Sequence, residues 1–244
     1  MSRAPVLPDG WTLVALQSVG STNDEAARLA GEGAAEGTVV WARQQTGGRG
    51  RRGRQWVSPV GNLYTSTILR PSCSAPRAAE LGFVAALAVA DLVPPGRAVR
   101  VKWPNDVLVD GGKVAGILPE SSIGADGKAE HVVLGVGVNV GFAPQLPEMR
   151  YPGAALGGSV EDALEKLTAA MAARLGQWRR EGFAKVREVW LDKAGPLGVD
   201  VDVKLGEELV RGRFAGMDRE GALLLETPAG PRKIVAGELL GRAA

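Results

Sequence analysis

The sequence predicts an α+β protein with a strand-rich main domain over residues 1–194 and a small antiparallel β-barrel over residues 195–244. Strand-like segments dominate the middle of the chain, and helix-like segments lie on both sides of them. The pair Gly195-Pro196 then interrupts the last helical segment. Beyond it, the strictly alternating stretch VDVDVKL is followed by turn signals at Gly206-Glu207 and at 218–221, which is typical of short antiparallel strands.

The first third of the chain alternates between strand and helix signals. Capping oxygens at 21–24 precede an Ala-rich segment, and a β-branched run breaks into a glycine-rich loop. In chain order we expect a strand over 11–16, a short helix ending at Gly31, a strand over 38–43, a strand that starts at Asn62, and a long helix from Pro76 to Pro94-Pro95.

The segments VRVKW, VLVDGGKVAGIL and HVVLGVGVNV predict three or four strands, with a hairpin turn at Asp110-Gly111-Gly112. Helical periodicity follows them. Apolar residues recur at steps of three and four and mark the buried face of a helix that is capped near Ser159: Leu164, Leu167, Met171, Leu175 and Trp178. The stretch AKVREVWLDKAG predicts a second helix before the domain boundary.

Composition excludes several classes of protein. The chain has 244 residues, 45% of them hydrophobic, so it can bury a full core and disorder is not expected. Its 29 basic and 27 acidic side chains leave a formal charge of +2, which favours neither DNA nor a membrane as a partner. Cys73 is the only cysteine, and the longest apolar run, Phe83 to Ala90, is too short to cross a bilayer. We expect a cytoplasmic protein.

The strongest candidate site is the segment from Gly47 to Trp56, where four arginines are spaced among glycines. Such a loop offers backbone amides and guanidinium groups to an anion, and it is flexible enough to close after a ligand enters. This chemistry suits a carboxylate and a phosphate held together. A solvated basic loop and an RGG-like nucleic-acid segment are the alternatives, but the position between two predicted strands favours a ligand-closing loop.

Two further segments carry polar groups that suit phosphate chemistry. Lys102, Asn105 and Asp106 follow a strand and could supply a phosphate contact, an orienting hydrogen bond, and either a proton acceptor or a Mg²⁺ ligand. The alternative is a structural turn around Trp103. Lys113 begins the segment KVAGIL, in which Gly116 allows close approach to the backbone.

The segment GVGVN, which ends at Asn139, predicts either a tightly packed buried strand or the floor of a pocket. His131, the only histidine, has no cysteine or carboxylate cluster near it in sequence, so we interpret it as structural. No spacing typical of metal ligands or of a Ser/His/Asp triad is found in the sequence.

Together GRGRRGRQW, KWPNDV, KVAGIL and GVGVN, in this order, resemble the biotin protein ligase family from about Ser21 to Glu238. The resemblance implies a mixed, largely antiparallel sheet with packed helices, as in class II tRNA synthetases and lipoyl ligases, plus a small C-terminal β-barrel. Residues 1–194 would then form the catalytic domain that binds biotin and ATP. Since many members add an N-terminal DNA-binding domain and this sequence begins near the catalytic part, it resembles the ligase-only form, without DNA as a partner.

The resemblance also assigns roles to residues, which overlap where the two substrates meet. It implies biotin contacts at Ser21, Thr22, Asn23, Gln45, Gly48, Arg49, Gly50, Arg51, Lys113 and Gly116. It implies contacts to ATP or the adenylate at Arg49, Arg51, Arg52, Arg54, Trp56, Lys102, Asn105, Lys113 and Asn139, with Trp56 stacking on adenine and Asn139 reading its edge. It implies catalytic roles for Arg51, Lys113, Lys102 and Asp106, and Asp106 would either bind Mg²⁺ or orient the acceptor amine.

The implied reaction has two steps. Biotin and ATP, with Mg²⁺, form biotinyl-5′-AMP and pyrophosphate, and a lysine of a biotin carboxyl carrier domain then receives the biotin. A homodimer is also possible, because sheet edges can pair with another copy or with the acceptor. The segment from Gly153 to Leu156 departs from the family, which often has a Thr-Ser pair there. A lipoyl ligase, an RNA-binding protein and a non-catalytic biotin-binding module are the competing interpretations.

Overall fold

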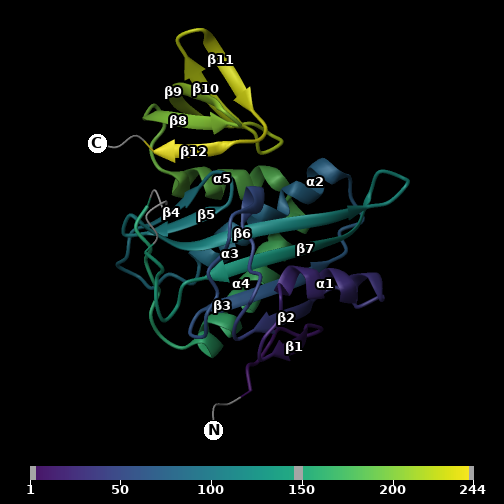
Figure 1. The fold of residues 1–244 in the computed structure, drawn as a ribbon. Coiled ribbons are helices and arrows are strands. Elements are labelled where there is room, and N and C mark those ends of the chain that lie inside the picture. The colour runs from purple at the N-terminus through teal and green to yellow at the C-terminus, as the bar shows by residue number, and fades with distance from the viewer. Residues whose placement is uncertain (1–3, 146–150, 242–244) are drawn as a thin grey trace.

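The computed structural model describes residues 4–145 and 151–241, and its largest element is a seven-stranded sheet (Figure 1). β1 and β2 run parallel, and the other neighbouring strands are antiparallel. This confirms the mixed, largely antiparallel sheet. The strand order is β1-β2-β3-β7-β6-β5-β4, with the bounds β1 (Thr12–Leu16), β2 (Thr38–Ala42), β3 (Leu63–Leu69), β4 (Val99–Lys102), β5 (Asp106–Val109), β6 (Gly112–Ile123) and β7 (Ala129–Val138).

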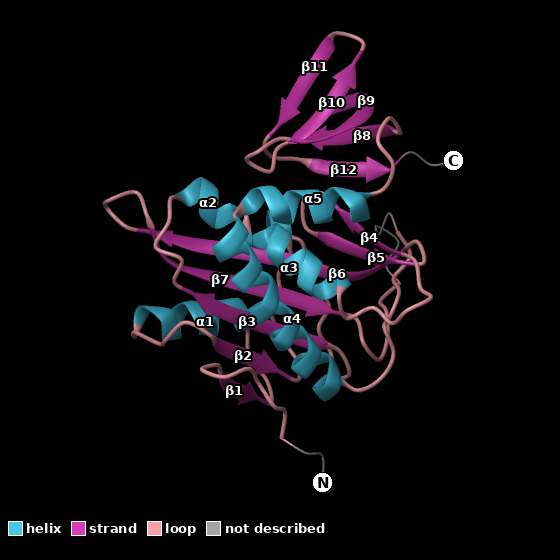
Figure 2. Ribbon diagram, turned by 180° about the vertical axis from the view of Figure 1, so that it is seen from behind, coloured by secondary structure: helices cyan, strands magenta, loops and turns pink. Residues whose placement is uncertain are grey.

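Helices cover the two faces of this sheet unequally (Figure 2). On one face lie α2 (Ala75–Ala79), α3 (Leu81–Ala90), α4 (Val160–Glu181) and α5 (Phe183–Ala194). On the other face α1 (Thr22–Gly31) packs Ala26 and Ala30 against Val40, Ile68 and Val133. Because α1 packs mainly on the β2, β3 and β7 part of its face and reaches β6 through Asn23, the rest of that face is left for a site.

The helix signals in the sequence are mostly confirmed. The five apolar residues from Leu164 to Trp178 are buried along α4, and the Ser159 hydroxyl accepts a hydrogen bond from the backbone N–H of Asp162, as a capping residue does. The long helix expected from Pro76 is instead two consecutive helices, α2 and α3, which meet at Glu80. None of the helices within residues 4–145 and 151–241 has the length and apolarity needed to cross a membrane.

The turn between β5 and β6 lies where the sequence predicted a hairpin turn, at Asp110-Gly111-Gly112. Asp110 and Gly111 both have positive φ, 52° and 82°, which is the two-residue hairpin turn that such a pair favours. Lys113 therefore comes directly after the turn, on β6.

The C-terminal strands form an open five-stranded antiparallel sheet, so the predicted β-barrel is wrong. In the order β11-β10-β9-β8-β12, the edge strands β11 and β12 do not pair with each other in the described residues. Apolar residues of this sheet, among them Val203, Phe214 and Leu223, join the core cluster of the main sheet and its helices, so closure is not needed to bury them. The strands are β8 (Asp200–Leu205), β9 (Glu208–Met217), β10 (Leu223–Thr227), β11 (Gly230–Ile234) and β12 (Glu238–Gly241).

Hydrogen bonds fix the C-terminal sheet on the rest of the molecule. The indole N–H of Trp103, which is buried, donates to the Gly221 carbonyl at 3.1 Å, and Arg187 Nε donates to the Met217 carbonyl at 2.6 Å. A side chain at Gly221 would collide with the ring of Phe83 at 2.7 Å. This docking brings β12 to the mouth of the main cavity.

Candidate active site

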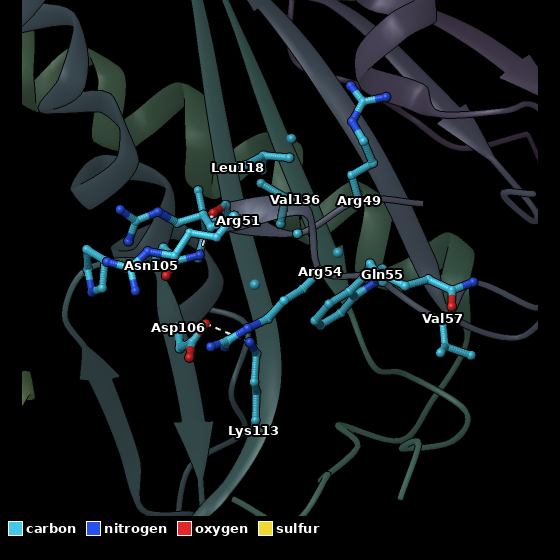
Figure 3. Close-up of a pocket in the computed structure, with 18 of the residues that line it drawn as sticks. Arg49, Arg51, Arg54, Gln55, Val57, Asn105, Asp106, Lys113, Leu118 and Val136 are labelled. Carbon is cyan, nitrogen blue, oxygen red and sulfur yellow. Dashed lines mark hydrogen bonds and ion pairs between the residues drawn. The ribbon is translucent and has the colours of Figure 1, made fainter. Parts of the chain in front are cut away.

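A cavity of about 730 Å³ opens on the face of the main sheet that α1 leaves partly uncovered. Its lining combines the start of α1, the loop from Gly47 to Trp56, the turn after β4, the strands β3, β6 and β7, and residues of the C-terminal sheet. Figure 3 shows residues of this loop, of the turn after β4, and of β6 and β7. Every site residue expected from the sequence lines it, with one exception. Gly48 is buried beside the cavity, where an added side chain would meet Ser58 Oγ and the Trp56 carbonyl at 2.5 Å.

The end of the cavity next to α1 carries uncharged polar groups that bind one another. Gln45 Oε1 accepts hydrogen bonds from the backbone N–H and the hydroxyl of Thr22, at 2.8 and 3.1 Å. Gln45 Nε2 donates to Ser58 Oγ at 3.0 Å, and Ser58 Oγ donates to the Trp56 carbonyl. This network fixes the orientation of the Gln45 amide and leaves one of its N–H groups for a ligand.

Asn23 is held inside the protein more completely than the sequence predicted. Its side-chain NH₂ donates to the Leu118 carbonyl and to Glu120 Oε2, and its oxygen accepts from the buried Ser66 hydroxyl at 2.6 Å. A side chain at Gly135 would lie 2.2 Å from Asn23 Oδ1, so only glycine leaves room for this amide. Asn23 is linked to its neighbour Thr22 through the Ser66 hydroxyl, which contacts both side chains, and its role toward biotin stays a prediction.

The second glycine of GVGVN, Gly137, leaves room for the ring of Trp56. Added Cβ atoms at Gly137 and Gly116 would lie 2.5 and 3.2 Å from the indole, so this ring packs closely against the paired strands β6 and β7. The indole N–H of Trp56 is buried and has no partner among the described residues, and Lys113 Nζ lies 5.3 Å from the ring centroid. The pocket-floor interpretation of GVGVN thus agrees with the geometry, although part of the floor holds protein side chains.

The arginine-rich segment forms a short ordered hairpin. The Trp56 N–H donates to the Gly48 carbonyl, the Gly50 N–H donates to the Arg54 carbonyl, and Arg49 pairs with Gln55. Arg52 at the tip takes a positive φ of 58°. We name residues 48–56 the arginine hairpin.

Its four arginines have different partners. Arg49 forms two hydrogen bonds of 2.6 Å with the Asp24 carboxylate, and in Figure 3 its side chain points away from Arg51, Arg54 and Lys113. Arg54 makes a two-pronged ion pair with Glu238 of β12, and Arg52 lies 3.9 Å from the same carboxylate. Within the described parts of the chain, Arg51 has no carboxylate partner, and burial lowers its pKa.

Three charged residues form a compact group beside Arg51. Lys113 Nζ lies 2.7 Å from Asp106 Oδ1, and Lys102 Nζ lies 3.6 Å from Asp106 Oδ2. Lys102 is 8% exposed, and burial lowers the pKa of its ammonium group although Asp106 raises it. Seven basic side chains and two carboxylates are among the described residues of the lining. That excess of positive charge suits a polyanion.

Asp106 was also a candidate Mg²⁺ ligand. No group of three possible metal-ligating side chains occurs in the described residues, and both oxygens of Asp106 already face lysines. Since Mg²⁺ is commonly held by one or two carboxylates together with substrate phosphates, these residues do not form a protein-held site. The role of Asp106 as a Mg²⁺ ligand stays a prediction.

Asn105 and Asn139 both line the cavity, yet both amides are bound inside the protein. Asn105 Nδ2 donates to the Ile117 carbonyl, which ties the turn after β4 to β6. Asn139 Nδ2 donates to the carbonyls of Lys113 and Ala154. The segment from Gly153, in which the sequence lacks the Thr-Ser pair, also binds Lys113 directly, because the Ala154 N–H donates to the Lys113 carbonyl at 2.9 Å. The role of Asn139 toward adenine stays a prediction.

Glu238 and Ser66 are the residues that sequence reasoning missed. Glu238 lies 184 positions from Arg54, so no local pattern connects the two. Ser66 lies within the fully buried strand β3, and its position next to Gly135 and Asn23 depends on strand pairing. A polar residue within a buried strand was the signal available for Ser66. Cys73 and His131 lie outside the cavity.

Known proteins share this arrangement. Residues 16–139 match the Biotin/lipoate A/B protein ligase family, and residues 197–239 match the Biotin protein ligase C terminal domain. A "Biotin--[acetyl-CoA-carboxylase] ligase" from Paracoccus denitrificans is 43% identical over 233 residues, which cover 90% of this chain and 96% of that protein. The "Bifunctional ligase/repressor BirA" of Escherichia coli is 32% identical, over 97% of this chain and 76% of its own.

A solved structure of biotin protein ligase from Aquifex aeolicus, in complex with biotin and ATP, superposes with a TM-score of 0.76. It is 28% identical and covers 96% of this chain and 99% of its own.

Proposed function

The chain belongs to the biotin/lipoate A/B protein ligase family and is a ligase enzyme, and we propose that it is an ATP-dependent biotin protein ligase. We propose further that it forms biotinyl-5′-AMP and then biotinylates a lysine of a biotin carboxyl carrier domain. One observation carries the proposal. A single cavity joins an uncharged hydrogen-bonding end to an end where basic side chains outnumber carboxylates.

The shape and chemistry of biotin match this polarity. Its ureido ring needs several hydrogen bonds when buried, since each one left unmade costs about 1–3 kcal/mol. The partnered groups of Thr22 and Gln45 offer a rigid set of such contacts. The apolar ring and chain would cross Gly116, Leu118 and Val136, and the carboxylate would reach the basic end.

At that end we propose that Arg51 and Lys113 hold the two anions that must meet. An oxygen of the biotin carboxylate attacks the α-phosphorus of ATP, and the bond to pyrophosphate breaks. Both cations neutralise the charge that gathers there, with Lys102 in support, and Arg52 and Arg54 can reach the leaving phosphates. Trp56 lies in the lining next to Lys113, where it could stack on adenine.

In the second step the acceptor amine attacks the acyl carbon, its nitrogen bonds to that carbon, and AMP leaves. Asp106 is the carboxylate nearest to Lys113 and could orient the attacking amine or accept its proton. The arginine hairpin over the cavity would keep water from the anhydride.

Two features favour biotin over lipoate and RNA. The C-terminal match is to a biotin protein ligase domain, and residues of the C-terminal sheet line the cavity. Arg49 and Arg54, whose charges an RNA-binding segment would leave free for phosphates, pair with Asp24 and Glu238 instead. We propose residues 1–194 as the catalytic part and residues 195–244 as the C-terminal part, with Glu238 connecting them.

The test is pyrophosphate release with ATP and biotin, followed by transfer to a purified biotin carboxyl carrier domain. We expect release only when both substrates are present, and biotin covalently on one carrier lysine. Lipoate in place of biotin is the control. Activity with lipoate alone would contradict the proposal, and so would biotin binding without any pyrophosphate.

A further inference from the structure

Arg49 differs from the other arginines of its hairpin in the direction of its side chain. Its guanidinium forms a two-pronged ion pair with Asp24, and Glu120 Oε1 lies 3.6 Å from Nη2. Two carboxylates thus surround one cation at the rim of the cavity. The hydrogen bond with Asp24 is the main reason that the pKa of Arg49 is raised and that of Asp24 is lowered.

The Asp24 carboxylate stands on a rigid support. It lies in the first turn of α1, directly after Thr22 and Asn23. Asn23 is 4% exposed and is fixed by Ser66, Leu118 and Glu120, so the backbone that carries Asp24 cannot shift without breaking buried hydrogen bonds. An ion pair with a rigid partner loses less side-chain entropy than one between two mobile surface residues.

The hairpin connects the ion pair of Arg49 and Asp24 to Arg51, so that the pair also restricts the position of Arg51. Arg49 and Gln55 face each other across the hairpin, and the Gly50 N–H donates to the Arg54 carbonyl. Arg51 directly follows Gly50, and its carbonyl accepts a hydrogen bond from the Arg54 N–H at 3.3 Å, so its direction depends on where the strand before it is held.

We propose that Arg49 is a positioning residue that acts through Asp24, and not a contact to the substrate anions. The pair fixes the first strand of the arginine hairpin on α1, so that Arg51 at the tip is directed into the cavity. This inference rests on the proposed function for its kinetic readout. This role differs from the one that the sequence resemblance implied for Arg49. The carboxylates of Asp24 and Glu120 balance the positive charge of the guanidinium, so it attracts a substrate carboxylate or phosphate only weakly.

A double-mutant cycle on the full-length protein tests the pair. The variants are Asp24→Asn, Arg49→Gln and the two combined, with Asp24→Glu as the conservative variant. Each single change should raise the KM for biotin and the rate of trypsin cleavage at Arg51 or Arg52 without ligand about two- to tenfold, the range for a two-pronged, partly exposed ion pair. The combined variant should be no worse than either single one, kcat should stay within about twofold, and Asp24→Glu should restore most of the loss.

Glu25→Gln is the matched control, because Glu25 is in the same helical turn but pairs with Arg28, away from the hairpin. A Glu25→Gln variant that behaves like Asp24→Asn would show a general effect on α1 and overturn the proposal. So would unchanged cleavage in Asp24→Asn, or a fall in kcat of about tenfold or more in Arg49→Gln alone, which would mean contact with the reacting groups. A wild-type protein that releases no pyrophosphate would refute the proposed function, whereas the cleavage rates would still decide the role of the pair.

Discussion

The two ends of the cavity are organised by opposite means. At the α1 end, Thr22, Asn23 and Gln45 are uncharged, and protein groups fix their orientation before any ligand arrives. At the other end, Arg51 has no carboxylate partner in the described residues, and Lys102 and Lys113 share the single carboxylate of Asp106. The first end is held by internal hydrogen bonds, and the second has an excess of positive charge that an anion would balance. A change at the first end should alter recognition, and one at the second should alter chemistry.

The change with the largest expected effect is Lys113→Ala. Under the proposed mechanism it should slow adenylation by about 10²–10³-fold, because one preorganised cation at the reacting phosphate is lost. Biotin affinity should stay within a few-fold, since Lys113 lies at the basic end. Pyrophosphate release and equilibrium binding of biotin measure the two quantities separately. Near-normal release would remove Lys113 from the mechanism, and a parallel loss of biotin binding would show that the two ends are not independent.

Trp56→Ala should have the next largest effect. Stacking on adenine is worth roughly 1–3 kcal/mol, so the KM for ATP should rise while the KM for biotin changes little. Because the indole packs on Gly116 and Gly137, a structural role is the competing explanation. Thermal melting distinguishes the two. A large fall in Tm together with equal losses for both substrates would identify Trp56 as a core residue.

Gly135→Ala tests the α1 end. The new methyl group would meet Asn23 Oδ1 at 2.2 Å, so the amide must move and the Ser66 and Glu120 contacts must weaken. We expect the Kd for biotin to rise about tenfold, with a smaller change for ATP, since displacing a tightly packed group costs about 1–3 kcal/mol. Isothermal titration with biotin measures this. Gly82→Ala is the matched control, because an added Cβ there has ordinary contact distances to Pro119. Unchanged biotin affinity in Gly135→Ala would mean that Asn23 does not support this end.

Sequence reasoning succeeded where local pattern determines structure. Strand periodicity, the Asp110-Gly111 turn and the Ser159 cap predicted their elements, and all of the predicted site residues except Gly48 line the cavity. It failed where distant segments meet. The glycines of GVGVN could not be assigned to Asn23 and Trp56 without the packing of α1 and the arginine hairpin on the sheet. The open C-terminal sheet also depends on long-range packing, because an alternating strand can bury its apolar face either in a barrel or against a neighbouring domain.

Glu238→Gln should have the smallest effect, and it tests whether the C-terminal sheet helps to organise the basic end. Glutamine keeps the shape and a hydrogen-bond acceptor but removes the charge that attracts Arg54 and Arg52. The Arg54 side chain is 64% exposed, so the pair is worth only about 0.2–1 kcal/mol, and trypsin cleavage of the arginine hairpin should rise by no more than about fivefold.

Because Arg54 lowers the pKa of Glu238, the contribution of the pair is present above the carboxyl's ordinary pKa and is lost as the pH falls through the lowered value. Hydrogen exchange of the hairpin amides, used here because trypsin is inactive in acid, should therefore agree between wild type and Glu238→Gln in acid and differ near neutral pH. Glu208→Gln, which breaks a pair with Arg232 in the same sheet, is the control and should leave hairpin cleavage unchanged. Equal cleavage of wild type and Glu238→Gln near neutral pH would show that the hairpin is held from the α1 side alone.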